Sequence, residues 1–309
     1  MNHYINYYYN IYPDSIHEEN KEIYFNYNDE IYYFVIFNRA IEEANYIYEL
    51  NVEMIKRGSL VHEIILNKDK SVVTYIDDIP YVLMRVYVNV NKKSDLAEIT
   101  FINMTNLDIK PNKLLDRSNW PMLWAAKVDY FEYQISQIGK KYPIICEYLS
   151  YYIGLAENAI SYVKNRGPND NSNIQNLTIA HRRIKATDTI FDLYNPLTLI
   201  IDYKCRDLAE YIKSAFFNGK DVWQLIENYF YLYDINLFDL QLLYARLLFP
   251  TYFFDVYEEI VEDRLKEESI MSIIDKASEY EEFLIEFHAF INKNNLMPQL
   301  DWLTKKNNI

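Results

Sequence analysis

The segment from His181 to Tyr211 constrains the fold more than any other part of this chain, because three motifs follow one another in it. It reads HRRIKATD, then the apolar run LTLIIDY, then RDLAEY. The apolar run predicts a buried strand, and Asp202 stands at its end. Asp207 comes directly before LAEYI, where its carboxylate would cap the amino terminus of a helix. The segment therefore predicts a loop, a strand that ends in an acid, and a helix.

This order resembles the phosphotransfer centre of kinase-fold enzymes. In an active small-molecule kinase of this architecture the loop reads His-Gly-Asp, with an Asn five residues after the Asp. Here the Gly position is Arg182, the position of the catalytic base is Arg183, and the Asn position is Asp188. A guanidinium stays protonated at physiological pH, so Arg183 cannot accept a proton from a substrate hydroxyl. The motif indicates a degenerate kinase, with His181 and Arg183 at degenerate catalytic positions.

Functional and structural roles are both considered for the remaining residues of the motif. His181 is expected to be a buried, hydrogen-bonded brace for the loop rather than an acid or base. Asp202 is the best candidate for a surviving metal ligand, and Asp188 would replace the missing Asn as an oxygen donor. Both aspartates could equally be turn residues. Asp207 is expected to be structural, and only four residues separate it from Asp202, which leaves little chain to grip an acceptor substrate.

The first ninety residues carry strand signals around one helix. Residues 22–27 and 31–37 are β-branched and aromatic runs on either side of Asn28-Asp29-Glu30, which predicts a hairpin. Residues 39–56 show helical spacing, and the further strands are predicted at 61–66, 72–76 and 81–88. This layout matches a kinase amino-terminal lobe of residues 1–92, with a hinge at 89–95. The chain is therefore predicted to be α+β and two-lobed, like protein kinases and aminoglycoside phosphotransferases.

The predicted hairpin lacks the glycines that a phosphate-binding loop needs for close backbone approach. The chain has five glycines, and the first is Gly58. The turn at residues 27–30 instead places two carboxylates where a triphosphate would lie. These features argue against conventional ATP binding.

The lysine and glutamate that a kinase uses on its third strand and following helix are also in doubt. Ile36 or Phe37 falls at the lysine position, and Arg39 is the nearest cation. Carboxylates are available on the predicted helix, and we expect them to form its solvated face: Glu42, Glu43 and Glu49.

From residue 93 to residue 309 the pattern is mainly helical. Residues 149–163 carry apolar side chains at i, i+3, i+4 and i+7, which predicts an amphipathic helix. Residues 191–202 suggest a hairpin that turns at Asn195-Pro196. Further helices are predicted from Asp207, from Val222, from Leu237, and from about 255 to 291.

Composition excludes several classes of partner. The net charge is −14, which disfavours binding to nucleic-acid backbones and to anionic membranes. No apolar run is long enough to span a membrane, and the two cysteines, Cys146 and Cys205, form no disulfide framework. We therefore expect a cytoplasmic protein without nucleic-acid partners or membrane insertion. The 31 tyrosines are read as codon bias, with oxidative cross-linking in an extracellular or spore layer as the alternative.

Four blocks of the chain together resemble the YutH-type branch of the CotS family of endospore coat-associated, kinase-like proteins from spore-forming Firmicutes. The blocks are YYIGLAENAISYV (151–163), HRRI (181–184), IIDYKCRDLAEYI (200–212) and LLYARLLFPTYFF (242–254). The resemblance is good across roughly residues 145–260 and looser before them. YARLLFP is the most specific block, because generic aminoglycoside-phosphotransferase-like kinases lack it.

The resemblance implies a two-lobed kinase-like protein that is made in the mother-cell cytoplasm and then joins the spore coat, with other coat proteins as partners. The branch also lacks the catalytic Asp, in agreement with Arg183. Arg246 of the YARLLFP block is expected to be a buried ion-pair or packing residue, with a role at the site as the alternative.

Three functions follow as hypotheses. The leading one is a pseudokinase that acts as a binding or assembly factor in sporulation and needs no cofactor. The second is an active small-molecule phosphotransferase with Mg-ATP, in which Asp188 and Asp202 hold the metal and Arg182 or Arg183 braces phosphates. The third is a tyrosine-rich structural component of the coat.

Overall fold

The computed structural model describes residues 1–19, 22–86, 93, 99, 113–164, 177–293 and 297. Contacts divide the chain into two compact units, each built from several stretches. Unit 1 comprises Met1–Asp116, Leu177–Arg183 and Thr187–Asp202. Unit 2 comprises Arg117–Asn176, Ile184–Ala186 and Tyr203–Ile309. The division differs from the boundary predicted near residue 92, because most of the HRRIKATD–LTLIIDY segment belongs with the amino-terminal sheet.

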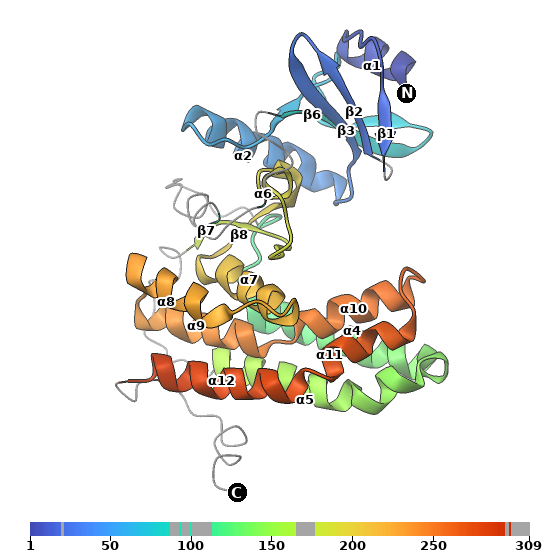
Figure 1. The fold of residues 1–309 in the computed structure, drawn as a ribbon. Coiled ribbons are helices and arrows are strands. Elements are labelled where there is room, and N and C mark those ends of the chain that lie inside the picture. The colour runs from blue at the N-terminus through green and yellow to red at the C-terminus, as the bar shows by residue number, and fades with distance from the viewer. Residues whose placement is uncertain are drawn as a thin grey trace, which may run out of the picture. The chain divides into compact units, whose positions relative to one another are not determined.

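Unit 1 is built on an antiparallel six-stranded sheet (Figure 1). The strands follow the order β1-β2-β3-β6-β4, and β5 pairs with β6. The elements are α1 (Asn2–Tyr9), β1 (His17–Glu19), β2 (Glu22–Tyr27), β3 (Glu30–Ile36), α2 (Ala44–Lys56), β4 (Glu63–Ile65), β5 (Thr74–Ile76) and β6 (Ile79–Val86). Every strand predicted here and the predicted helix are present, whereas α1 and β1 were not predicted.

Tight turns with left-handed residues set the hairpins of this sheet. Asn28 and Asp29 have φ of 51° and 63°, and Asp77 and Asp78 have φ of 50° and 63°. Two consecutive positive φ angles give the turn whose twist suits a two-residue hairpin, and Asn and Asp tolerate them best among residues with a side chain. The turn at Asn28 joins the second and third strands, so the predicted phosphate loop was placed one hairpin too late. The β1–β2 turn lies outside the described residues.

The two faces of the sheet are covered by different elements. One face packs against Ile5 of α1 through Ile23, Phe25 and Phe34, all of them buried. Since side chains alternate along a strand, Tyr33, Val35 and Phe37 lie on the opposite face.

The stretch between residues 177 and 203 folds differently from the prediction. It forms β7 (Leu177–His181), the short helix α6 (Ile190–Leu193), a 3-10 turn over Pro196–Thr198, and β8 (Leu199–Tyr203). The predicted hairpin at Asn195-Pro196 was wrong, because the Asn195 side chain accepts a hydrogen bond from the backbone N–H of Leu197 and starts the 3-10 turn. β8 pairs instead with β7.

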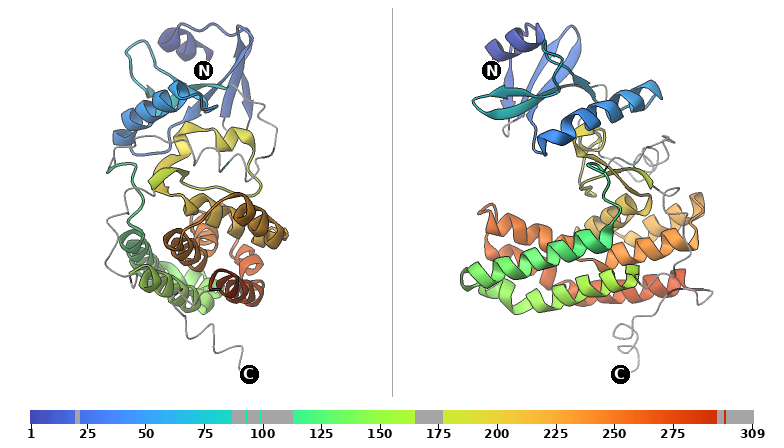
Figure 2. Two further views of the ribbon diagram at one scale, coloured as in Figure 1. Left: turned by 90° about the vertical axis from the view of Figure 1, so that its left-hand side faces the viewer. Right: turned by 180° about the vertical axis from the view of Figure 1, so that it is seen from behind.

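Unit 2 consists of helices, several of which pack lengthwise (Figure 2). They are α4 (Trp120–Ile138), α5 (Pro143–Lys164), α7 (Cys205–Phe217), α8 (Val222–Leu232), α9 (Leu237–Leu248), α10 (Thr251–Val261), α11 (Met271–Ile274) and α12 (Ala277–Ile291). The single helix predicted for 255–291 is interrupted after Val261, where Asp263 has a φ of 59°. The predicted loop 169–176 lies outside the described residues, as does the predicted hinge except for Lys93.

Candidate functional site

His181 braces the loop as the sequence indicates. It is the last residue of β7, is 2% exposed, and its Nε2 donates a hydrogen bond of 2.8 Å to the carbonyl oxygen of Leu193. Because a carbonyl only accepts, the Nε2 atom must carry the proton. The bond joins the end of β7 to the end of α6.

The two arginines that follow are exposed and contact main-chain carbonyls. Arg182 Nη1 donates to the carbonyl oxygen of Asn38 at 3.2 Å, and Arg183 Nη1 donates to that of Arg182 at 3.0 Å. The base position therefore carries a permanent cation that donates hydrogen bonds.

Arg39 forms a buried cluster next to the strand that should carry the catalytic lysine. Its side chain is 2% exposed, its Nε lies 2.5 Å from Glu43 Oε2, and its Nη1 donates to the carbonyls of Leu197 at 3.0 Å and Leu199 at 2.7 Å. We call these four residues the Arg39 cluster. Glu42 and Glu49 are exposed as predicted, but Glu43 is buried, so its assignment to the solvated face was wrong.

The three aspartates of the motif lie in different settings. Asp202 is fully buried, one residue before the end of β8, and Asp188 is partly exposed between β7 and α6. Asp207 is also fully buried, but it lies inside the first turn of α7, whose N-cap is Lys204; the predicted N-cap role was wrong. Within the described ranges, no three His, Cys, Asp or Glu side chains form a metal-binding group. A metal at Asp188 and Asp202 stays a prediction.

A row of aromatic rings lies on the face of the sheet opposite α1. The centroids of His17 and Tyr24 are 5.1 Å apart, and those of Tyr24 and Tyr33 are 5.6 Å apart. Phe191 of α6 continues the row, at 4.5 Å from Tyr33 and 4.9 Å from His62. We call these five residues the aromatic row.

The aromatic row shares its face of the sheet with Phe37, one of the two residues predicted at the lysine position. Phe37 follows Tyr33 at an even spacing, so both side chains lie on the same side of the strand, and Phe37 is 2% exposed. Ile36, the other candidate for the lysine position, lies on the opposite side and is 41% exposed. Neither candidate carries a cation, and Phe191 of α6 packs on Tyr33, on the same side as Phe37.

His62 is a feature that the sequence reading missed. Its side chain is fully buried, its Nε2 donates to the carbonyl of Phe191 at 3.1 Å, and its backbone N–H donates to the carbonyl of Tyr194. Nδ1 is buried without a hydrogen-bond partner among the described residues. Burial lowers the pKa of His62 to about 4. A histidine inside the apolar run LVHEII was the available signal.

Unit 2 contains a second buried charge cluster, centred on Glu210 of α7. Its Oε1 lies 2.9 Å from Lys213 Nζ and 2.7 Å from Arg246 Nε, and its Oε2 accepts from Thr251 Oγ1 at 2.9 Å. We call these four residues the Glu210 network. Burial lowers the pKa of Lys213 to about 8.

Arg246 is a packing and ion-pair residue, as expected. Its guanidinium lies 4.9 Å from the ring centre of Trp120 and 5.7 Å from that of Trp124, within reach of a cation–π interaction. Residues of two of the four sequence blocks, 200–212 and 242–254, therefore meet in one buried network.

The sequence matches a family model and a relative among known proteins. The family model described as "Spore coat putative kinase YutH" matches residues 2–287. The endospore coat-associated protein YutH of Bacillus subtilis (strain 168) is 27% identical over 210 residues, which cover 60% of this chain and 61% of that protein. The matched region is thus about three fifths of the relative's length.

Solved structures of similar fold are phosphotransferases. Spectinomycin phosphotransferase APH(9)-Ia, solved with ADP and spectinomycin, matches 89% of this chain and 93% of its own with a TM-score of 0.58 and 12% identity. An aminoglycoside phosphotransferase from Alicyclobacillus acidocaldarius matches 91% and 93%, with a TM-score of 0.61 and 9% identity. At these identities the likeness shows a kinase-like α+β fold and nothing about activity.

Proposed function

Because the chain belongs to the YutH family of spore coat putative kinases, we propose that it is a degenerate kinase that serves as a binding and assembly factor in the spore coat. The observation that carries this proposal is the contact between Tyr33 and Phe191, whose ring centres are 4.5 Å apart. The contact lies on the same side of the strand as Phe37, one of the two candidates for the lysine position of a kinase. Arg183 at the base position, and Ile36 or Phe37 in place of a lysine on the third strand, support the same conclusion.

Association with the coat is inferred from the relative, which is named as endospore coat-associated. We place this protein in the mother-cell cytoplasm and then in the coat, with other coat proteins as partners. Searched over the residues that the structure describes, no helix is both long enough and apolar enough to cross a membrane.

An active phosphotransferase is the second candidate, and the buried Asp202 at the end of β8 is the observation that favours it. Asp202 and Asp188 would hold Mg-ATP through oxygen ligands, and the metal would neutralise charge on the transferred phosphoryl group. Arg182 or Arg183 would then brace phosphates instead of providing a base.

A thermal melt with and without Mg-ATP separates the two candidates. A ligand that binds only the native state raises stability by RT ln(1 + [L]/Kd), about 2.7 kcal/mol at a hundredfold excess over Kd. We expect no shift in millimolar Mg-ATP or Mn-ATP. A metal-dependent shift that Asp202→Asn removes, while Asp78→Asn in an exposed turn retains it, would establish a nucleotide site and overturn the proposal. Melts of both variants without ligand show whether either substitution disturbs the fold.

A further inference from the structure

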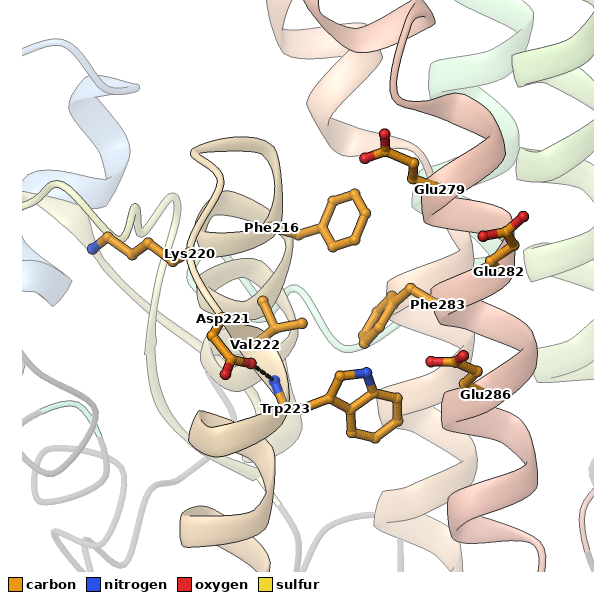
Figure 3. A pocket seen from close by; sticks show the side chains of 9 residues that line it. All are labelled: Phe216, Lys220, Asp221, Val222, Trp223, Glu279, Glu282, Phe283 and Glu286. Atoms are coloured by element: carbon orange, nitrogen blue, oxygen red, sulfur yellow. Dashed lines mark hydrogen bonds between the residues drawn. The ribbon is translucent and has the colours of Figure 1, made fainter.

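Unit 2 has a groove between α12 and the segment that joins α7 to α8. Its volume is about 270 Å³. Figure 3 shows the rings of Phe216, Trp223 and Phe283 between the two sides, and three carboxylates along α12. The ring centres of Trp223 and Phe283 are 5.7 Å apart, and those of Phe216 and Phe283 are 5.5 Å apart. We call this feature the α8–α12 groove.

The acidic side of the groove has a regular spacing. Glu279, Glu282 and Glu286 are exposed and lie at i, i+3 and i+7 of one helix, so neighbouring carboxylates on this face repel one another. Among the described residues, none of the three carboxylates has a hydrogen bond or ion pair. Within the described part of the chain no cation offsets the repulsion between these carboxylates. A bound cation on this face would relieve it.

The other two charged residues of the groove are engaged elsewhere. Lys220 Nζ donates to the carbonyl of Ala186 at 2.7 Å. Asp221 caps α8 by accepting from the backbone N–H of Trp223 at 2.9 Å (Figure 3). The groove therefore presents three glutamates, with no lysine directed at them from its own lining.

The residues that line the groove suit an organic cation better than a metal ion. The described residues include no group of three acidic, His or Cys side chains that could hold a metal. An aromatic face beside a carboxylate instead suits a guanidinium or ammonium group, which gains both a cation–π contact and an ion pair. Arginine is favoured because its planar group stacks on indole rings.

The dimensions of the groove fit an extended peptide better than a small molecule. Glu279 and Glu286 are separated by about 10 Å along the helix axis, from a rise of 1.5 Å per residue. In an extended polyproline II chain, which has three residues per turn and a rise of about 3.1 Å, basic side chains three residues apart lie on the same side and span about 9 Å. Drug-sized ligands usually occupy pockets of about 300–1,000 Å³ that enclose them, whereas this groove is smaller.

We propose that the α8–α12 groove binds an extended segment of a partner protein through arginine or lysine side chains, one of them stacked on Trp223. Peptide binding at this surface does not depend on whether the protein binds a nucleotide. The ATP melt and the peptide measurement below can therefore fail separately.

The test uses the full chain and a fluorescein-labelled peptide with two arginines three residues apart, followed by fluorescence anisotropy at low salt. The groove variant replaces Glu279, Glu282 and Glu286 by Gln, and the matched control replaces the exposed Glu132, Glu147 and Glu157 of α4 and α5 by Gln. Both variants change the net charge equally. We expect the groove variant to weaken binding by about tenfold or more, and the control by less than about twofold.

Trp223→Ala tests the stacking contact. It should weaken peptide binding by about fivefold, while the same peptide with citrulline in place of arginine should bind the unaltered protein no better than background. Equal losses in the groove and control variants would mean non-specific attraction to an acidic protein and would overturn the proposal. So would binding of spermine that displaces the peptide at equal concentration, since the site would then accept a free polyamine. Absence of peptide binding at about 1 mM would also overturn it.

Discussion

The Arg39 cluster of unit 1 and the Glu210 network of unit 2 both bury cationic side chains, but they satisfy them differently. Arg39 pairs with the carboxylate of Glu43 and donates to the main-chain carbonyls of Leu197, just before β8, and of Leu199, the first residue of β8. Lys213 and Arg246 share one carboxylate, and Lys213 also donates to the carbonyls of Arg246 and Phe249. The first cluster positions a loop, whereas the second joins three helices.

Charge serves different purposes in the two units of this kinase-like fold. In unit 1, the cations nearest the altered motif bond to backbone, so they stabilise the shape of the segment. In unit 2, the charges make a network between α7, α9 and the start of α10. Since removing one partner of a buried charge set leaves the rest uncompensated, the two clusters should respond unequally to mutation.

The largest effect is expected for Glu210→Ala. The substitution leaves Lys213 and Arg246 buried without this carboxylate and should lower the free energy of unfolding by about 3–5 kcal/mol. Urea unfolding of the variant measures it, with the exposed Glu157→Ala as a control that changes stability by less than about 0.5 kcal/mol. Lys213→Met removes one of the two cations and should cost less than Glu210→Ala. Equal costs would contradict the idea that uncompensated charge dominates.

Arg39→Ala should lower the free energy of unfolding by about 2–4 kcal/mol, because Glu43 and two carbonyls lose their buried donor. Hydrogen exchange of the amides in β8 should accelerate. Arg57 provides the control, since it pairs with Glu53 at the same sequence separation but is 36% exposed. Arg57→Ala should change stability by less than about 0.5 kcal/mol. If both arginine variants behaved alike, the Arg39 cluster would be no more than a surface pair.

His62 gives unit 1 a pH dependence in the acidic range. The unfolded side chain binds its proton below pH 6.5, but burial delays protonation of the folded one until the pKa of about 4. The stability that His62 contributes is thus fully present above pH 6.5 and is lost as the pH falls to about 4, by about 2–3 kcal/mol. Melts at pH 7 and pH 5 measure the loss, and His62→Gln should reduce it because its amide does not titrate. An unchanged loss in that variant would assign the effect to carboxylates.

The smallest effect is expected from restoring the motif. Arg183→Asp combined with Asp188→Asn recreates the base and the Asn of an active loop. Because Phe37 and the aromatic row remain, we expect ADP release from ATP to stay at the wild-type background. ADP release above background that Asp202→Asn abolishes would show that the base alone had been missing. It would also contradict the idea that the cations of unit 1 only stabilise the shape of a loop.

Local patterns predicted much of the fold, and long-range pairing explains most of what they missed. The β2–β3 hairpin follows from alternating apolar residues around Asn28-Asp29, and α5 follows from its apolar stripe. The partner of β8 is β7, which lies before the HRRIKATD loop, and no local signal indicates that pairing. The Asn195-Pro196 turn signal was real, but it marks the start of a 3-10 turn.

The candidate site shows the same limit. The order His181, Asp202, Asp207 was readable because each residue belongs to a short motif. The burial of Glu43 depends on carbonyls more than 150 residues away, through Arg39. The contact of Phe191 with Tyr33 likewise joins distant segments, so neither feature has a signature in the local sequence.

The composition of unit 1 from separated stretches has a consequence for how the protein is made. The chain leaves this unit at Asp116 and returns at Leu177. Phe191, Leu197 and Leu199 are therefore still unsynthesised when the amino-terminal sheet emerges from the ribosome. At about 5–20 residues per second, the sheet waits several seconds for the side chains and carbonyls that complete it. Unit 1 comes first in the chain, yet it cannot be finished until residue 202 has been translated.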